Sequence, residues 1–176
     1  ILSKAEINDP DFTPESLHHR KHLPLLTPNM LTEKERRALF DGSCYVFSFV
    51  RHPFKRAVSA YTDKILGNKQ QKREILEALG KQDEKNSYPV SFDDFIAVIA
   101  DQDPATLNPH WRPQSLNLAT DLIRYDFIGR LESFDAGMAQ VRARLRLPDF
   151  GTPHRNRKSH QASAIQDITA ATRIKL

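Results

Sequence analysis

Residues 45–61, YVFSFVRHPFKRAVSAY, contain the strongest fold signal of the chain. The run from Cys44 to Val50 is almost continuously apolar and rich in β-branched and aromatic residues, which predicts a strand covered on both faces. Pro53 suits the first turn of a helix, where its missing N–H would have no partner, so a helix should begin beside Arg51. The stretch therefore predicts a buried strand, a sharp turn and a helix, with Arg51 at the end of the strand.

Arg51 and Ser59 are the first candidate binding residues. Ser59 follows Arg51 by eight residues, or about two helical turns. An arginine and a hydroxyl that converge near the carboxyl end of a strand favour a phosphate clamp. The alternative is that Arg51 only satisfies backbone carbonyls at the turn.

With Tyr61 the stretch completes the pattern F-V-R-x-P-F-x-R-x-x-S-x-Y. This pattern closely resembles the 3′-phosphate-binding segment of the PAPS-dependent carbohydrate sulfotransferases. These are the Golgi chondroitin and dermatan enzymes of sulfotransferase family 2 and their bacterial relatives. The resemblance implies that Arg51 and Ser59 hold the 3′-phosphate of 3′-phosphoadenosine-5′-phosphosulfate (PAPS), and it adds Arg56 and Tyr61 to the cofactor site. Arg56 has the alternative of a solvated helix charge.

Two further segments match the same family in the expected order. Residues 108–114, NPHWRPQ, resemble its His-Trp-x-x-Gln element, and residues 125–132, YDFIGRLE, resemble the strand and turn that follow. Arg130 stands where the family more often has lysine, so the charge is kept. We expect Glu132 to stabilise the start of the next helix, because a carboxylate is favourable at a helix N-terminus.

His110 is the leading candidate for a general base, with Trp111 and Gln114 shaping a substrate pocket. Sulfuryl transfer requires the acceptor hydroxyl to lose its proton, and a histidine with a pKa near ~6.5 suits that step. The alternative is that His110 only stiffens its loop by a hydrogen bond. Three upstream histidines compete for the base role, or form a solvated basic face: His18, His19 and His22.

A late basic loop, residues 152–159 (TPHRNRKS), resembles the family segment that closes over the nucleotide. The resemblance implies cofactor contacts from Asn156 and Lys158. A charge run of this kind is otherwise a solvated surface.

The remaining elements are predicted from periodicity and end signals. We expect loop over residues 1–30 and irregular structure over 101–118. A second buried strand is predicted over 122–129. Helices are predicted over 32–40, 53–66, within 69–85, over 91–100 and over 131–147. Strands that alternate with helices indicate a parallel sheet with helical cover.

Composition sets the outer limits. The chain has 176 residues, 39% of them hydrophobic, and a formal net charge of +4, enough for one domain with an anionic ligand. The mean hydropathy is −0.55, and no apolar run is long enough to predict a membrane-spanning helix. The single cysteine, Cys44, excludes an intrachain disulfide framework and favours a bacterial, cytoplasmic protein. The alternative is the Golgi lumen, with a membrane anchor outside this sequence.

One part of the family pattern is missing from the sequence. The lysine loop that binds the 5′-phosphosulfate is not recognisable in residues 1–44, nor is the usual last helix in residues 162–176. We therefore expect a single sulfotransferase-like domain over 1–176 that lacks both elements.

Together these features predict an α/β domain with a three-layer, P-loop-kinase-like fold and a central parallel sheet. The resemblance implies transfer of a sulfuryl group from PAPS, without a metal, to a hydroxyl of a carbohydrate-type acceptor. A non-catalytic module that binds PAP or a sulfated glycan is the alternative. A nucleotide kinase lacks its glycine-lysine loop here, and no motif supports nucleic-acid binding. The oligomeric state stays open.

Overall fold

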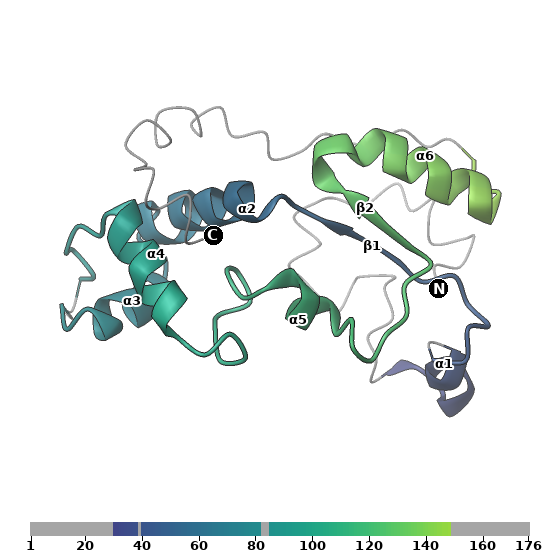
Figure 1. Cartoon of the computed structure of the whole chain (residues 1–176), viewed down its shortest axis with the longest axis horizontal. Coiled ribbons are helices and arrows are strands. Elements are labelled where there is room, and N and C mark those ends of the chain that lie inside the picture. Colours follow the sequence, from purple (N-terminus) through teal and green to yellow (C-terminus); the bar gives the residue numbers. More distant parts are fainter. Residues whose placement is uncertain (1–29, 39, 82–84, 149–176) are drawn as a thin grey trace. The chain divides into compact units, whose positions relative to one another are not determined.

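The computed structural model describes residues 30–38, 40–81 and 85–148 (Figure 1). The chain divides into two compact units, Ile1–Val46 and Phe47–Leu176. In the first unit, α1 (Glu33–Ala38) begins with a capping box: the Thr32 N–H donates to Glu35 over 2.8 Å, and the Glu35 N–H donates to the Thr32 hydroxyl. The predicted capped helix is therefore confirmed. Cys44 is half-buried in this unit, and its thiol donates to the Ala38 carbonyl.

The second unit contains a parallel pair of strands, β1 (Phe47–Val50) and β2 (Phe127–Arg130). Their register pairs Phe47 with Phe127 and Val50 with Arg130. The predicted α/β organisation with a parallel sheet is thus confirmed. Both strands are shorter than predicted, and full burial was wrong for them: among their residues only Gly129 is buried.

Helix α6 (Phe134–Leu145) follows β2 through the short 3₁₀ turn η6 (Leu131–Ser133) and lies along the strand pair (Figure 1). Phe49 of β1 is the residue that holds this packing together. Its ring lies 4.6 Å from the Phe134 ring, centroid to centroid, and over Gly129 and Gly137. A Cβ atom at Gly137 would come within 2.6 Å of the Phe49 ring, so both glycines are required by close approach.

Helix α2 (Pro53–Ala60) begins at the predicted proline and continues as the π-helix η5 (Tyr61–Leu66), which ends at Gly67. Next come α3 (Lys72–Ala78) and α4 (Phe92–Asp101). These three helices confirm the predictions for 53–66, 69–85 and 91–100. The region 101–118 was predicted to be irregular, but it contains the five-residue helix α5 (Gln114–Leu118).

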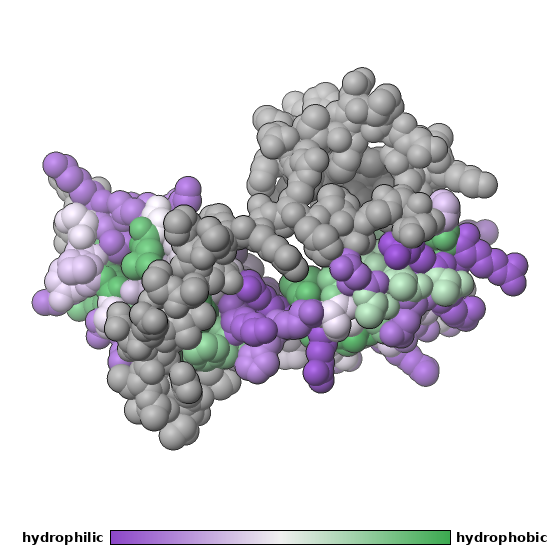
Figure 2. All heavy atoms as spheres, turned by 90° about the horizontal axis from the view of Figure 1, so that it is seen from above, coloured by the Kyte–Doolittle hydropathy of each residue, from purple (hydrophilic) through white to green (hydrophobic). Residues whose placement is uncertain are grey.

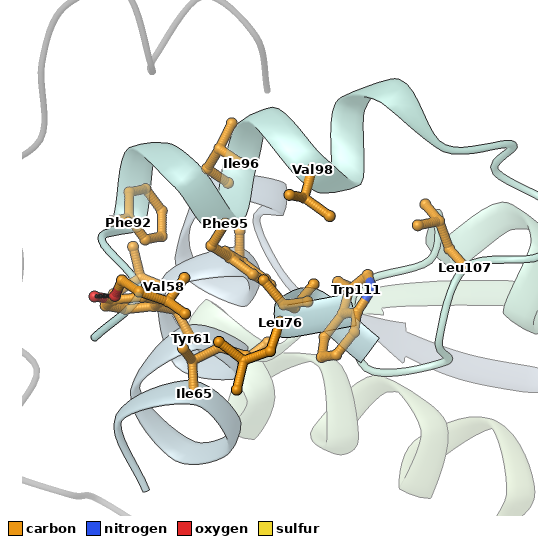
Figure 3. Packing of buried hydrophobic residues seen from close by; sticks show 14 residues of the cluster. Val58, Tyr61, Ile65, Leu76, Phe92, Phe95, Ile96, Val98, Leu107 and Trp111 are labelled. Carbon is orange, nitrogen blue, oxygen red and sulfur yellow. Dashed lines mark hydrogen bonds between the residues drawn. The ribbon is translucent and has the colours of Figure 1, made fainter. Parts of the chain in front are cut away.

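The hydrophobic core of the second unit lies among α2, η5, α3, α4 and the loop before α5 (Figure 3). Phe95 is completely buried at its centre, and its ring packs edge-on against Trp111 at a centroid distance of 5.5 Å. The predicted inward residues Phe92 and Ile96 are buried, while Ile99 packs against the core from a partly exposed position. The helices of the second unit therefore contain its hydrophobic core.

Hydrophilic residues cover much of the described surface in Figure 2, with hydrophobic ones showing between them. Several large apolar side chains of the second unit are exposed, among them Leu122, Ile128 and Leu131. Within the described ranges, no helix is both long and apolar enough to cross a membrane.

Candidate functional site

The site is built around Arg51, at the carboxyl end of β1. Its backbone is held by the side-chain amide of Gln114: the Arg51 N–H donates to Gln114 Oε1 over 2.8 Å, and Gln114 Nε2 donates to the Arg51 carbonyl over 2.7 Å. These two reciprocal hydrogen bonds resemble one hydrogen-bonded residue pair of a β-ladder. They extend the strand's pairing to the residue where the chain must turn, and so they set the position of Arg51.

Glu132, which follows the second strand, binds the backbone of the turn after β1. Its Oε1 accepts a hydrogen bond of 3.0 Å from the N–H of His52, the residue that caps α2. This bond lowers the pKa of Glu132, with smaller contributions from the positive charges of Lys55 and Arg51. We had expected Glu132 to act at the start of its own helix, but its main bond crosses from the end of β2 to the end of β1.

The two other predicted cofactor residues on this helix differ from each other. Ser59 is half-buried, and its hydroxyl has no hydrogen bond within the described part of the chain. Tyr61 is buried in the core, where its hydroxyl donates to the Val90 carbonyl over 2.8 Å. Burial raises the pKa of Tyr61, and the Asp94 carboxylate adds to the effect. The structure therefore gives Tyr61 a packing role, and its predicted cofactor contact stays a prediction.

Arg56 is partly buried and bonded to backbone carbonyls, so it is not the solvated helix charge that was the alternative, while its predicted cofactor contact stays a prediction. Its Nη1 donates to the Arg112 carbonyl and its Nη2 to the Pro109 carbonyl, each over 2.6 Å. Partial burial lowers the pKa of Arg56. Both terminal nitrogens of the guanidinium are therefore bonded to the loop that carries His110.

The loop before α5 is folded on itself and anchored. Asn108 accepts the His110 N–H through its side-chain oxygen at 3.1 Å and donates to Glu74 of α3 at 2.8 Å. Trp111 is only 6% exposed, and its Nε1 has no hydrogen-bond partner among the described residues. The predicted substrate residue Trp111 thus belongs to the core, and Gln114 serves the Arg51 backbone.

His110 is exposed, as are the neighbouring Pro109 and Pro113 of this loop. The pKa of His110 is lowered, first by partial burial and next by the Lys64 ammonium, while Asp63 acts in the opposite direction. A smaller lowering comes from Arg56 and a smaller raising from Glu74. The imidazole is therefore neutral at pH 7 and able to accept a proton, which is the state that a general base needs.

A pocket with a volume of about 540 Å³ lies between α2, α4 and the loop before α5. Its lining is mostly apolar, with Arg56, Gln102 and Gln114 as polar members. Trp111 lines this pocket, whereas His110 does not.

Several predicted residues lie outside the described ranges: Asn156, Lys158, His18, His19 and His22. No group of three His, Cys, Asp or Glu side chains in the described ranges could hold a metal ion. Sequence reasoning missed Asn108 and Asn117, which anchor the loop. The Asn-Pro pair at 108–109, a turn-initiating signal, pointed to the first of them.

The fold and the site define an α/β protein with an arginine-bearing turn between a strand and a helix. The chain belongs to the sulfotransferase family, whose model matches residues 3–175. It is 28% identical over 124 residues to carbohydrate sulfotransferase 14 of Homo sapiens, covering 67% of this chain and 32% of that protein. It is 27% identical over 195 residues to carbohydrate sulfotransferase 11 of Rattus norvegicus, covering 97% and 53%.

A third relative, carbohydrate sulfotransferase 12 of Mus musculus, is 31% identical over 131 residues, which covers 63% of this chain and 31% of the relative. The chain thus spans about a third to a half of the length of the curated relatives it matches. No solved structure matches significantly.

Proposed function

We propose that this chain carries out, or forms part of an enzyme that carries out, sulfuryl transfer from PAPS to a hydroxyl of a carbohydrate-type acceptor. One observation carries the proposal: the family match runs over residues 3–175, and Arg51 stands at the end of β1 beside the start of α2. The named relatives are all carbohydrate sulfotransferases, which favours an enzyme over a non-catalytic binding module.

In this proposal Arg51 and Ser59 hold the 3′-phosphate of PAPS, and Asn156 and Lys158 complete the nucleotide site. The acceptor oxygen forms a bond to sulfur while the bond from sulfur to the bridging oxygen of the 5′-phosphate breaks. The acceptor proton passes to His110, and PAP leaves with the electron pair of the broken bond. The lowered pKa of His110 supports this role, because the residue starts the reaction unprotonated.

The finer features follow the family. We propose that the strand pair belongs to a P-loop-kinase-like parallel sheet and that residues 1–176 form one sulfotransferase-like domain. The 5′ side of PAPS would be held by the family's lysine loop, which is not recognisable in residues 1–44. Transfer would rest on positively charged side chains without a metal ion. The relatives named above come from vertebrates and give no support to a bacterial origin. We therefore propose the alternative location, the Golgi lumen.

The nucleotide site is tested by calorimetric titration with PAP, with 5′-AMP as the ligand that lacks the 3′-phosphate. We expect PAP to bind at least 10-fold more tightly than AMP, since a charge-assisted phosphate contact contributes about 1.5–3 kcal/mol. Arg51→Ala should abolish this preference, whereas Arg73→Ala, an exposed arginine on α3, should retain it. Equal affinity for PAP and AMP would contradict the proposed site.

The base is tested by the pH dependence of transfer from PAPS to a panel of glycan acceptors. Because the pKa of His110 lies below its ordinary value of 6.5, activity should fall on acidification only once the pH passes below that value. His110→Gln should remove this acidic limb and lower kcat by about 10²–10⁴-fold. PAP binding without any transfer by the wild-type chain would instead identify the non-catalytic module.

A further inference from the structure

The two carbonyls that Arg56 binds flank the candidate base. Pro109 comes directly before His110, and Arg112 follows it by two residues. Both bonds are short, at 2.6 Å, and both run from one planar guanidinium, which fixes the direction of two donors at once. One side chain of α2 therefore sets the path of the backbone on either side of His110.

Five other contacts hold the same loop. The Asn117 amide of α5 donates to the Pro109 carbonyl over 2.9 Å, and its oxygen accepts from Arg112 Nε over 2.9 Å. The Asn108 carbonyl accepts the amide N–H groups of Trp111 and Arg112, at 3.0 and 2.8 Å. The Trp111 ring is anchored in the core against Phe95.

The loop also connects His110 to the phosphate clamp. Gln114 lies four residues after His110 and bonds both backbone groups of Arg51. Arg56 lies five residues after Arg51, on the helix that the Arg51 turn begins. The loop is thus tied to the two ends of the segment 51–56, once through Gln114 and once through Arg56.

Resting on the function proposed above, we propose that Arg56 is a positioning residue that holds His110 in register with Arg51 and does not bind the cofactor. The reason is that the terminal nitrogens of the Arg56 guanidinium already donate hydrogen bonds within the protein. A phosphate that took both terminal nitrogens of Arg56 would remove the side-chain donor of the Arg112 carbonyl and would leave the Pro109 carbonyl with the Asn117 amide alone as its side-chain donor among the described residues. The Arg112 carbonyl is partly buried, so the loss of its donor is unfavourable.

The loop itself is tested by native-state hydrogen exchange of the Trp111 and Arg112 amides. In Arg56→Met we expect both amides to exchange about 10-fold faster or more, because local opening no longer breaks two strong bonds. Arg56→Lys keeps the charge but reaches one carbonyl at most, so it should give a smaller change in the same direction. Amides of α4 report whether either variant is still folded, and Arg73→Met serves as the matched control. Unchanged exchange in Arg56→Met would overturn the proposal.

Kinetics separate positioning from cofactor binding. In Arg56→Met we expect kcat to fall by about 10²-fold, the size reported for small misplacements of catalytic groups, while the KM for PAPS and the Kd for PAP change less than about 2-fold. A tenfold weaker Kd for PAP in both variants, with loop exchange unchanged, would make Arg56 a phosphate ligand and refute the proposal. If the wild-type chain neither binds PAP nor transfers sulfate, the proposed function fails. Loop exchange then still decides whether Arg56 positions His110.

Discussion

The helical region and the strand pair of the second unit are held together in different ways. The helical region packs side chains from α2, η5, α3 and α4 into one core in which Phe95, Ile75 and Leu76 are completely buried. The strand pair has no fully buried side chain, and its packing on α6 converges on a single ring, that of Phe49. Burial in the first region is shared among many residues, whereas in the described part of the second the ring contacts centre on Phe49 and the fully buried side chain is Val141 of α6.

The difference matters because Arg51 lies at the junction of the two regions. Arg51 directly follows the last residue of β1, and α2 begins two residues later at Pro53. Its position is set by polar bonds from Gln114 and, through His52, from Glu132, rather than by burial of apolar area. A site held by such bonds can be altered without unfolding the helical core.

The largest effect should come from Phe95→Ala. Removing this fully buried ring should lower the free energy of unfolding by about 3–5 kcal/mol, because a cavity remains among the surrounding core side chains. The matched variant is Phe47→Ala in β1, whose side chain is 39% exposed and should cost less than about 1 kcal/mol. Denaturant unfolding followed by circular dichroism measures both. Similar losses in the two variants would remove the distinction between the regions.

Gly137→Ala should produce the next largest effect, this time in the strand region. The new Cβ would come within 2.6 Å of the Phe49 ring, so the ring or α6 must move, at a cost of about 1–3 kcal/mol. Phe49→Leu, a smaller side chain, should recover part of the loss when the two changes are combined. If the double variant loses as much as the sum of the two single ones, Phe49 is not the residue that opposes the new methyl group.

Local signals predicted most of the helices. The serine and threonine caps, the proline at 53 and Gly67 mark boundaries that depend only on neighbouring residues, and each agrees with the structure. The parallel pairing of the strands also followed from the alternation of elements. The short helix α5 was missed because Pro113, which caps it, was taken only as a loop signal.

Long-range polar bonds could not be predicted in the same way. A sequence motif places Arg56 and Tyr61 beside Arg51 along the chain, but it does not say which way each side chain points. In the structure Arg56 reaches carbonyls more than 50 residues away, and Tyr61 turns into the core. Membership of a motif therefore identified the right helix without separating its binding residues from its supporting ones.

Tyr61→Phe tests that separation directly. The variant keeps the ring in the helical core and removes only the hydroxyl that donates to the Val90 carbonyl, so we expect a loss of stability of about 0.5–1.5 kcal/mol. Affinity for PAP, measured by calorimetry, should stay the same. A clear fall in PAP affinity without a fall in stability would restore the predicted cofactor role of this residue.

The smallest effect on stability is expected from removing the capping box, which occurs at the start of two different helices. Ser91 caps α4, whose inner face is buried in the helical core, and Thr32 caps α1, which buries no residue. Ser91→Ala should therefore lower the global free energy of unfolding by about 1 kcal/mol, because α4 cannot fray without opening the core.

Thr32→Ala breaks an equivalent set of bonds, but α1 can unwind locally while the second unit stays folded. Hydrogen exchange should then show faster exchange in α1 alone, with the midpoint of global unfolding unchanged. A shift of that midpoint equal to the shift in Ser91→Ala would mean that α1 unfolds together with the core, and that the stability of a cap does not depend on how deeply its helix is buried.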